Sequence, residues 1–301
     1  MVTVLRPLST SELLDRTFHL YRNNFLVFVG ITAIPQLAVL VLQLGGAALI
    51  SQRSVTGFLA TTIVAALINV LALEVSQAVA VVAVSSLHLD KPASIGSAYS
   101  AAKGSLLRVL WISFVVFLVV AGIFGAAVGI AAGVRAAMGP VAGVLGFLAL
   151  IPAMYLVIHL SLAWSLAVPA TMLEGGGFTA STRRSSFLTK GGRWRIFGVL
   201  FLMGIFGAIV AMVLQFAFVL PVRLLGLHDR FTAQAVTQAL TACSAFLSNS
   251  LIGALGTIAL TLIYYDQRVR KEGFDLQLMM SALEGSGPAD APAPSPASAG
   301  I

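Results

Sequence analysis

Long apolar stretches separated by short charged connections run through most of the 301-residue chain. Each stretch has at least the roughly 20 residues that a helix with a rise of about 1.5 Å per residue needs to cross a bilayer. Lipid tolerates only helices and closed barrels, and barrel strands would show alternation over about ten residues. The pattern therefore predicts an all-α membrane protein with six transmembrane helices, within residues 23–52, 54–89, 109–134, 136–173, 196–222 and 231–265.

A short amphipathic segment precedes every second apolar stretch. One helical face of residues 10–22 carries leucine and aromatic side chains, and the other face carries most of the charges. Ser9 and Glu12 have the spacing of a capping box at the start of this helix. The same pattern recurs in residues 93–107 and 178–190. We therefore expect three hairpins, each preceded by a short amphipathic helix on the cytoplasmic surface.

The junctions between amphipathic and apolar segments recur at similar spacing. Arg22, Lys103 and Lys190 stand at the three junctions, 81 and 87 residues apart. This periodicity predicts approximate repeats within a single membrane domain. The expected boundaries are 1–284 for the domain, 9–90, 91–174 and 175–265 for the repeats, 266–284 for a short final helix, and 285–301 for a disordered Pro/Ala-rich tail.

The composition and the distribution of charge agree with a membrane setting. Hydrophobic residues make up 58% of the chain and charged residues only 10%, against about 25% charged in soluble domains. One set of connections holds 14 Lys and Arg residues, and the other holds only Arg53, Arg135, Arg223 and Arg230. The positive-inside rule then places both termini in the cytoplasm, with the chain in a bacterial inner (plasma) membrane.

Several classes of function are disfavoured by the sequence. The net charge of +7 is spread between apolar runs and forms no continuous basic patch, so we expect no nucleic-acid partner. Cys243 is the single cysteine, and the four histidines are scattered. Neither a metal-binding pattern nor a cofactor motif is present. We therefore expect no metal, no cofactor and no enzymatic activity.

Five polar residues within the apolar stretches are candidates for an intramembrane site: Asn69, Glu74, Gln77, Tyr155 and His159. A carboxylate inside a bilayer is expensive, so Glu74 is a functional hypothesis by default. If the helices meet, His159 could donate to Glu74 or carry a proton. Alternatively, Glu74 is protonated and serves only as a hydrogen-bonded packing contact between helices.

A basic cluster precedes the fifth apolar stretch and contains a tryptophan at the expected interface depth. These side chains predict contacts with anionic lipid headgroups, although positive charge here could also serve orientation alone. The candidate residues are Arg183, Arg184, Lys190, Arg193, Trp194 and Arg195.

Two further patterns concern packing. Gly125, Gly129 and Gly133 form a small-residue stripe that predicts close approach of another helix. Acidic residues near the charged connections are expected to pair with the basic cluster and hold the surface helices to the bundle, with a small contribution from exposed pairs. These residues are Glu174, Asp266 and Glu272.

Three stretches carry a family resemblance: residues 6–22, residues 168–175 continuing to 184–195, and residues 264–276. They resemble bacterial multi-pass proteins labelled as the membrane domain of glycerophosphoryl diester phosphodiesterase. The resemblance covers nearly the whole chain except the tail and implies no catalytic residues to carry over. The phosphodiesterase catalytic domain is a separate soluble barrel, and no connection in this chain is long enough to contain one.

The sequence thus favours a non-enzymatic integral membrane protein, acting as a partner or regulatory module for an unidentified membrane protein. The alternative is a small transporter or channel with a polar site around Glu74 and His159. The lipid bilayer is the expected partner in both cases, and the oligomeric state is open.

Overall fold

The computed structural model of the chain describes residues 8–51, 55–89, 91–139, 148, 150–224 and 229–273. Helices account for 91% of these residues and no strand occurs among them, which confirms the all-α fold. The expected tail at 285–301 and the part of the expected final helix after Gly273 lie outside the described residues. In chain order the helices are α1 (Thr10–Asn23), α2 (Phe25–Ser51), α3 (Val55–His88), α4 (Ile95–Ala102), α5 (Leu106–Met138), α7 (Leu150–Trp164), α8 (Ala167–Glu174), α9 (Phe178–Thr189), α10 (Arg193–Leu224) and α11 (Arg230–Glu272).

Six helical segments of the described chain are long and apolar enough to cross a membrane, as the sequence predicts. The fourth, Leu150–Glu174, is interrupted where α7 ends and α8 begins. Pro169 explains the break, because a proline cannot donate to the carbonyl of Ser165 four residues earlier and its ring collides with that carbonyl. The apolar stretch 136–173 thus contributes one candidate span, and Pro169 interrupts its helix, as a proline inside an apolar stretch can.

A serine from α9 satisfies the backbone groups that the break exposes. The Ser185 hydroxyl donates to the carbonyl of Ala163 at 2.7 Å and accepts from the amide of Leu166 at 3.0 Å. Ser185 is fully buried, and an unsatisfied backbone group shielded from water costs several kcal/mol. This pair of hydrogen bonds therefore holds α9 against the junction of α7 and α8.

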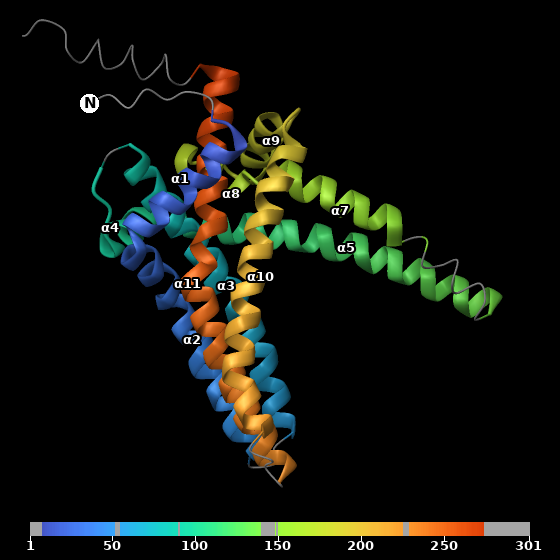
Figure 1. Cartoon of the computed structure of the whole chain (residues 1–301). Helices are drawn as coiled ribbons and strands as arrows, with labels where there is room; N and C mark the ends of the chain where they lie inside the picture. The colour runs from blue at the N-terminus through green and yellow to red at the C-terminus, as the bar shows by residue number, and fades with distance from the viewer. Residues whose placement is uncertain are drawn as a thin grey trace, which may run out of the picture.

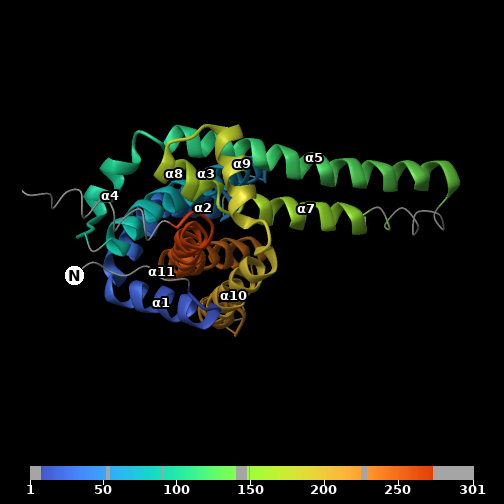
Figure 2. The same ribbon diagram turned by 90° about the horizontal axis from the view of Figure 1, so that it is seen from above.

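The central helix of the bundle is α11, which packs against α2, α3 and α10. Viewed from above, it is surrounded by these helices and by α1 (Figure 2). Half of the most apolar window of α11 is buried within the chain, against 6% of the corresponding window of α5. The 43 residues of α11 span about 65 Å at about 1.5 Å per residue, more than the roughly 45 Å of a whole bilayer.

The helices α5 and α7 pack on each other and extend away from the bundle as an arm (Figure 1). Gly125, Gly129 and Gly133 lie on this arm, and a Cβ added at any of them would meet no atom within 4 Å. The glycine stripe thus packs against no helix of the described chain. The grouping into hairpins, and the repeats at 9–90, 91–174 and 175–265, stay predictions.

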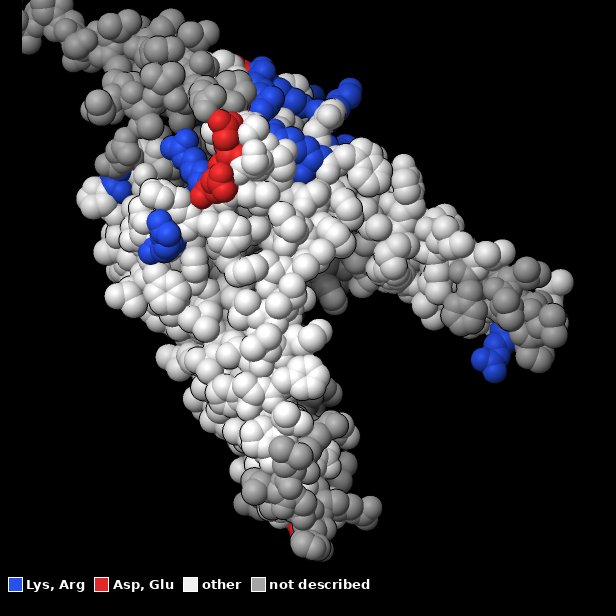
Figure 3. Space-filling model, in the orientation of Figure 1, with Lys and Arg blue, Asp and Glu red and all other residues white. Residues whose placement is uncertain are grey.

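Charged side chains gather at one end of the bundle, around α1 and the last turns of α11, as Figure 3 shows for one face. At its centre the fully buried carboxylate of Asp266 accepts from Arg195 at 2.6 Å and from Arg270 at 2.9 Å. It also accepts from the amide of Leu8 at 2.8 Å, while both guanidinium groups donate to the Leu8 carbonyl. This network, the charged layer, places the two described ends of the chain side by side.

The surface helix α1 begins with the expected capping box, formed by Ser9 and Glu12. Its residues Leu13 and Thr17 are fully buried against the bundle. In α4, the Tyr99 hydroxyl donates to the carbonyl of Ile31 at 2.8 Å. Burial raises the pKa of Tyr99 from about 10 to about 12, further above physiological pH.

Replacing Asp266→Asn should destabilise the protein by about 2–3 kcal/mol, because Arg195 and Arg270 would lose their shared counter-charge. The expected readouts are a lower thermal midpoint in detergent and faster proteolysis at the start of α1. The matched control is Asp15→Asn, which removes an exposed carboxylate from α1. Equal effects of the two substitutions would contradict this account.

Replacing Ser185→Ala should cost about 1–3 kcal/mol, since the buried amide of Leu166 loses its partner and the carbonyl of Ala163 keeps only the longer bond from Thr189, at 3.4 Å. Thermal unfolding in detergent measures this loss. The control is Ser186→Ala, the same chemical change at a neighbouring half-buried residue of α9. If the control were as destabilising, the junction would not depend on Ser185.

Candidate functional site

The structure divides the expected intramembrane polar site among different places. On α3, Glu74 accepts a hydrogen bond from Ser113 of α5 at 2.5 Å. The Asn69 carbonyl accepts from Gln36 of α2 at 3.3 Å. Gln77, one turn beyond Glu74, is half-buried. These contacts join α3 to α5 and to α2.

His159 contacts a different group from the one expected. Its Nε2 lies 2.6 Å from a guanidinium nitrogen of Arg193, the first residue of α10, and its ring stacks on Tyr155 with centroids 6.0 Å apart. Because the guanidinium is always a donor, the imidazole nitrogen acts as the acceptor. The expected neighbour Glu74 is bonded to Ser113 instead.

His159 lines a cleft of about 560 Å³ between the end of α7 and the start of α10, which we name the α7–α10 cleft. Part of the expected lipid-contacting cluster lies here together with two members of the expected polar site. The cleft is lined by Tyr155, Ile158, His159, Leu162, Lys190, Gly191, Arg193, Trp194 and Phe197.

A tight turn between α9 and α10 positions the basic groups of the cleft. Gly191 has a φ of +85°, in the region that favours glycine. The ammonium of Lys271 donates to the carbonyls of Phe187 and Lys190, each at 2.7 Å. The turn is thereby fixed to the end of α11, and α10 starts directly beside the cleft.

Two basic side chains contribute positive charge to this cleft. Lys190 and Arg193 line it, and the N-terminus of α10 contributes a partial positive charge and free backbone amides. The Nε of Arg193 is buried and has no hydrogen-bond partner among the described residues. Such an arrangement attracts an anion with several acceptor oxygens, for which guanidinium geometry is well suited.

Most of the remaining lining of the cleft is apolar or aromatic. The side chains of Tyr155 and Trp194 are 69% and 79% exposed, and Phe197 packs edge-to-face against Trp194 with centroids 5.9 Å apart. Exposed aromatic side chains at the start of an apolar helix are typical of the membrane–water interface. The cleft therefore joins a cationic region to a surface suited to acyl chains.

The remaining members of the predicted basic cluster have other roles. Arg184 pairs with Glu174 and Glu272, and the hydrogen bond to Glu272 raises its pKa. Arg195 belongs to the charged layer, whereas Arg183 is exposed on α9. The expected pairing of the three acidic residues is confirmed, but the pairs of Asp266 are more deeply buried than expected.

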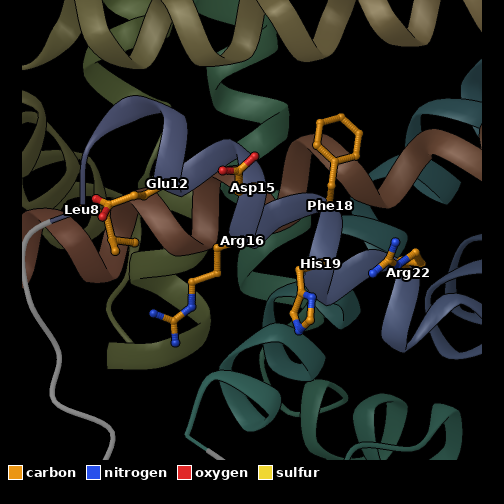
Figure 4. A pocket seen from close by; sticks show the side chains of 7 residues that line it. All are labelled: Leu8, Glu12, Asp15, Arg16, Phe18, His19 and Arg22. Carbon is orange, nitrogen blue, oxygen red and sulfur yellow. The ribbon is translucent and has the colours of Figure 1, made fainter.

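A second depression, of about 620 Å³, runs along α1 (Figure 4). Its charged side chains point in different directions: Asp15 projects to one side of the helix, and Arg16 and His19 project to the other. Glu12 is already occupied in the capping box. This arrangement is the polar face of an amphipathic helix and lacks the convergence of the α7–α10 cleft.

Six apolar helical segments and one charged end define a polytopic all-α membrane protein. Residues 142–282 match the family described as the membrane domain of glycerophosphoryl diester phosphodiesterase. This confirms the resemblance for the part of the chain that contains the cleft, and the match concerns a membrane domain alone. Comparisons with curated proteins and with solved structures gave no match.

Replacing Glu74→Gln should change the free energy of unfolding by less than about 1 kcal/mol, because the amide carbonyl can still accept from Ser113. Replacing Ser113→Ala removes the donor and should cost about 1–2 kcal/mol. Thermal unfolding in the same detergent compares the two variants. A much larger loss for Glu74→Gln would show that the carboxylate itself is required and would contradict the packing role.

Proposed function

We propose that this protein is a non-catalytic membrane module that binds the phosphodiester headgroup of an anionic glycerophospholipid in the α7–α10 cleft. The observation that carries the proposal is the convergence of Lys190, Arg193 and the α10 N-terminus beside an open aromatic surface. A headgroup and its acyl chains present the matching combination of an anion and an apolar tail.

The two basic side chains contribute in different ways. A guanidinium donates two parallel hydrogen bonds to phosphate oxygens, and an ammonium acts as a compact point charge. The contact with His159 restricts the guanidinium of Arg193 before a ligand arrives. Such pre-organisation reduces the entropy lost on binding.

The position of the cleft supports a lipid rather than a soluble ligand. The cleft lies where the apolar helix α10 begins, and Trp194 is at the depth expected of an interfacial anchor. An anionic headgroup at this depth would keep its glycerol and acyl chains along Tyr155 and Phe197. A bilayer supplies such ligands at high local concentration.

The family match gives further support for a phosphodiester ligand. All residues that line the cleft fall within the matched segment 142–282. The family description names glycerophosphoryl diesters, which carry the linkage found in phospholipid headgroups. A membrane domain that holds such a headgroup would serve as a partner or regulatory module and would need no catalytic residues of its own.

The alternative function, a transporter with a polar site around Glu74 and His159, has less support from the geometry than headgroup binding. It requires Glu74 and His159 to share a site, whereas Glu74 bonds Ser113 and His159 bonds Arg193. The cleft also places its two basic groups near the surface, where they can meet headgroups directly. Headgroup binding is therefore the function that this arrangement favours.

Native mass spectrometry of the full chain, equilibrated with equal amounts of phosphatidylglycerol and phosphatidylcholine, tests the proposal. The wild-type protein should retain phosphatidylglycerol preferentially. Replacing Arg193→Gln should reduce that retention about tenfold, since hydrogen bonds to charged groups contribute about 1.5–3 kcal/mol. The matched control Arg183→Gln removes the same charge from the exposed surface of α9 and should have little effect.

Equal losses for the two variants would indicate general electrostatic attraction and would overturn the proposal. A competition experiment distinguishes binding of the lipid from binding of its free headgroup. If glycerophosphoglycerol displaces the lipid as effectively as added phosphatidylglycerol does, the ligand is a free phosphodiester. Weak competition by the soluble headgroup is the expected result.

A further inference from the structure

A partly open cavity lies between α2, α3 and α11 and has no residue in common with the α7–α10 cleft. Its volume is about 190 Å³. Its hydrogen-bonding side chains are Gln43, Thr61, Thr62, Asn69 and Gln238. We name this site the bundle cavity.

The lining of the bundle cavity is polar but uncharged. Amide and hydroxyl groups line it together with apolar side chains, and no Asp, Glu, Lys or Arg is among the described lining residues. These walls offer an ion no counter-charge for the hydration that it would lose on binding. Their chemistry therefore favours neutral molecules.

The hydrogen-bonding capacity of these walls is not used up within the protein. The side chains of Gln43, Thr62 and Gln238 have no hydrogen-bond partner among the described residues. Asn69 uses its carbonyl to accept from Gln36, which leaves its amide hydrogens available. These groups are therefore free to hydrogen-bond an occupant of the cavity, and such an occupant would replace the hydrogen bonds that hydrocarbon does not offer.

The size of the bundle cavity limits that occupant. At roughly 30 Å³ per water, its volume corresponds to on the order of six water molecules, or to one solute of a few carbon and oxygen atoms. The amides and hydroxyls of the walls both donate and accept. A hydroxyl group does the same, so a compact polyol matches both the volume and the chemistry.

We propose that the bundle cavity is a binding site for a small neutral polyol of about the size of glycerol. The proposal is independent of headgroup binding, because the two sites share no residue. The sequence predicted a polar intramembrane site that contains Asn69, Glu74 and His159. In the structure, the polar residues that line a cavity together with Asn69 are neutral, and Glu74 and His159 are not among them.

Cysteine accessibility tests the proposal in full-length protein reconstituted in liposomes, with Cys243→Ser as the background. Thr62→Cys places a thiol on the lining of the cavity, and Ile63→Cys places one on the adjacent residue, which is also exposed but does not line the cavity. A thiol must ionise to react, so 2-hydroxyethyl methanethiosulfonate should label the first about tenfold faster. Glycerol should slow that labelling, whereas sucrose of equal osmolarity, being too large, should not.

A pair of leucine substitutions then tests the walls. Gln238→Leu removes one of the unpaired amides and should abolish protection of Thr62→Cys by glycerol. Val236→Leu is the control, since it introduces the same side chain at a partly exposed position of α11. Retained thermal stability of both variants ensures that lost protection reports on binding rather than on folding.

Three results would overturn the proposal. Equal labelling of Thr62→Cys and Ile63→Cys would show that the cavity is no more hydrated than the neighbouring surface. Labelling that glycerol does not slow would indicate a hydrated cavity without a polyol site. Equal slowing by sucrose and glycerol would indicate an osmotic effect on the liposomes.

Discussion

Hydrocarbon offers no hydrogen bonds, so each polar group of a membrane-embedded chain must find its partner within the protein or at a hydrated surface. The architecture of this protein follows from where those partners are supplied. Ser185 bridges the interrupted fourth segment, and Asp266 binds both the backbone of Leu8 and two guanidinium groups. Surface helices are therefore attached to the bundle at the points where backbone or charge would otherwise lack a partner.

Burial is distributed unevenly between the two parts of the molecule. The bundle packs around α11, whereas the α5–α7 arm contacts the rest mainly near the charged end. The contact between Glu74 and Ser113 is one tie between them, and Arg108 of α5 adds another by donating to the carbonyl of Gly175 at 2.5 Å. Apolar residues on the arm consequently face lipid rather than protein, which agrees with a bilayer as solvent.

The sequence was sufficient to predict the helical class, the six apolar segments and the capping box at Ser9, because each depends on local pattern or on spacing along one helix. It could not predict which polar residues would meet, since that depends on how helices are placed in space. The apolar stretches were identified by the absence of charged residues, so the neutral residues Gln43 and Gln238 were missed as site candidates. The signal that could have identified them is a glutamine amide within an otherwise apolar stretch. Arg193 was assigned to lipid contact, but its neighbour His159 was assigned to a different site.

The α7–α10 cleft has one wall on each part of the molecule: α7 belongs to the arm and α10 to the bundle. A molecule that touches both walls would therefore contact the arm and the bundle at once, and the cleft would exist only while these two parts keep the arrangement seen here. The shape of the cleft thus depends on the few contacts that connect the arm to the bundle.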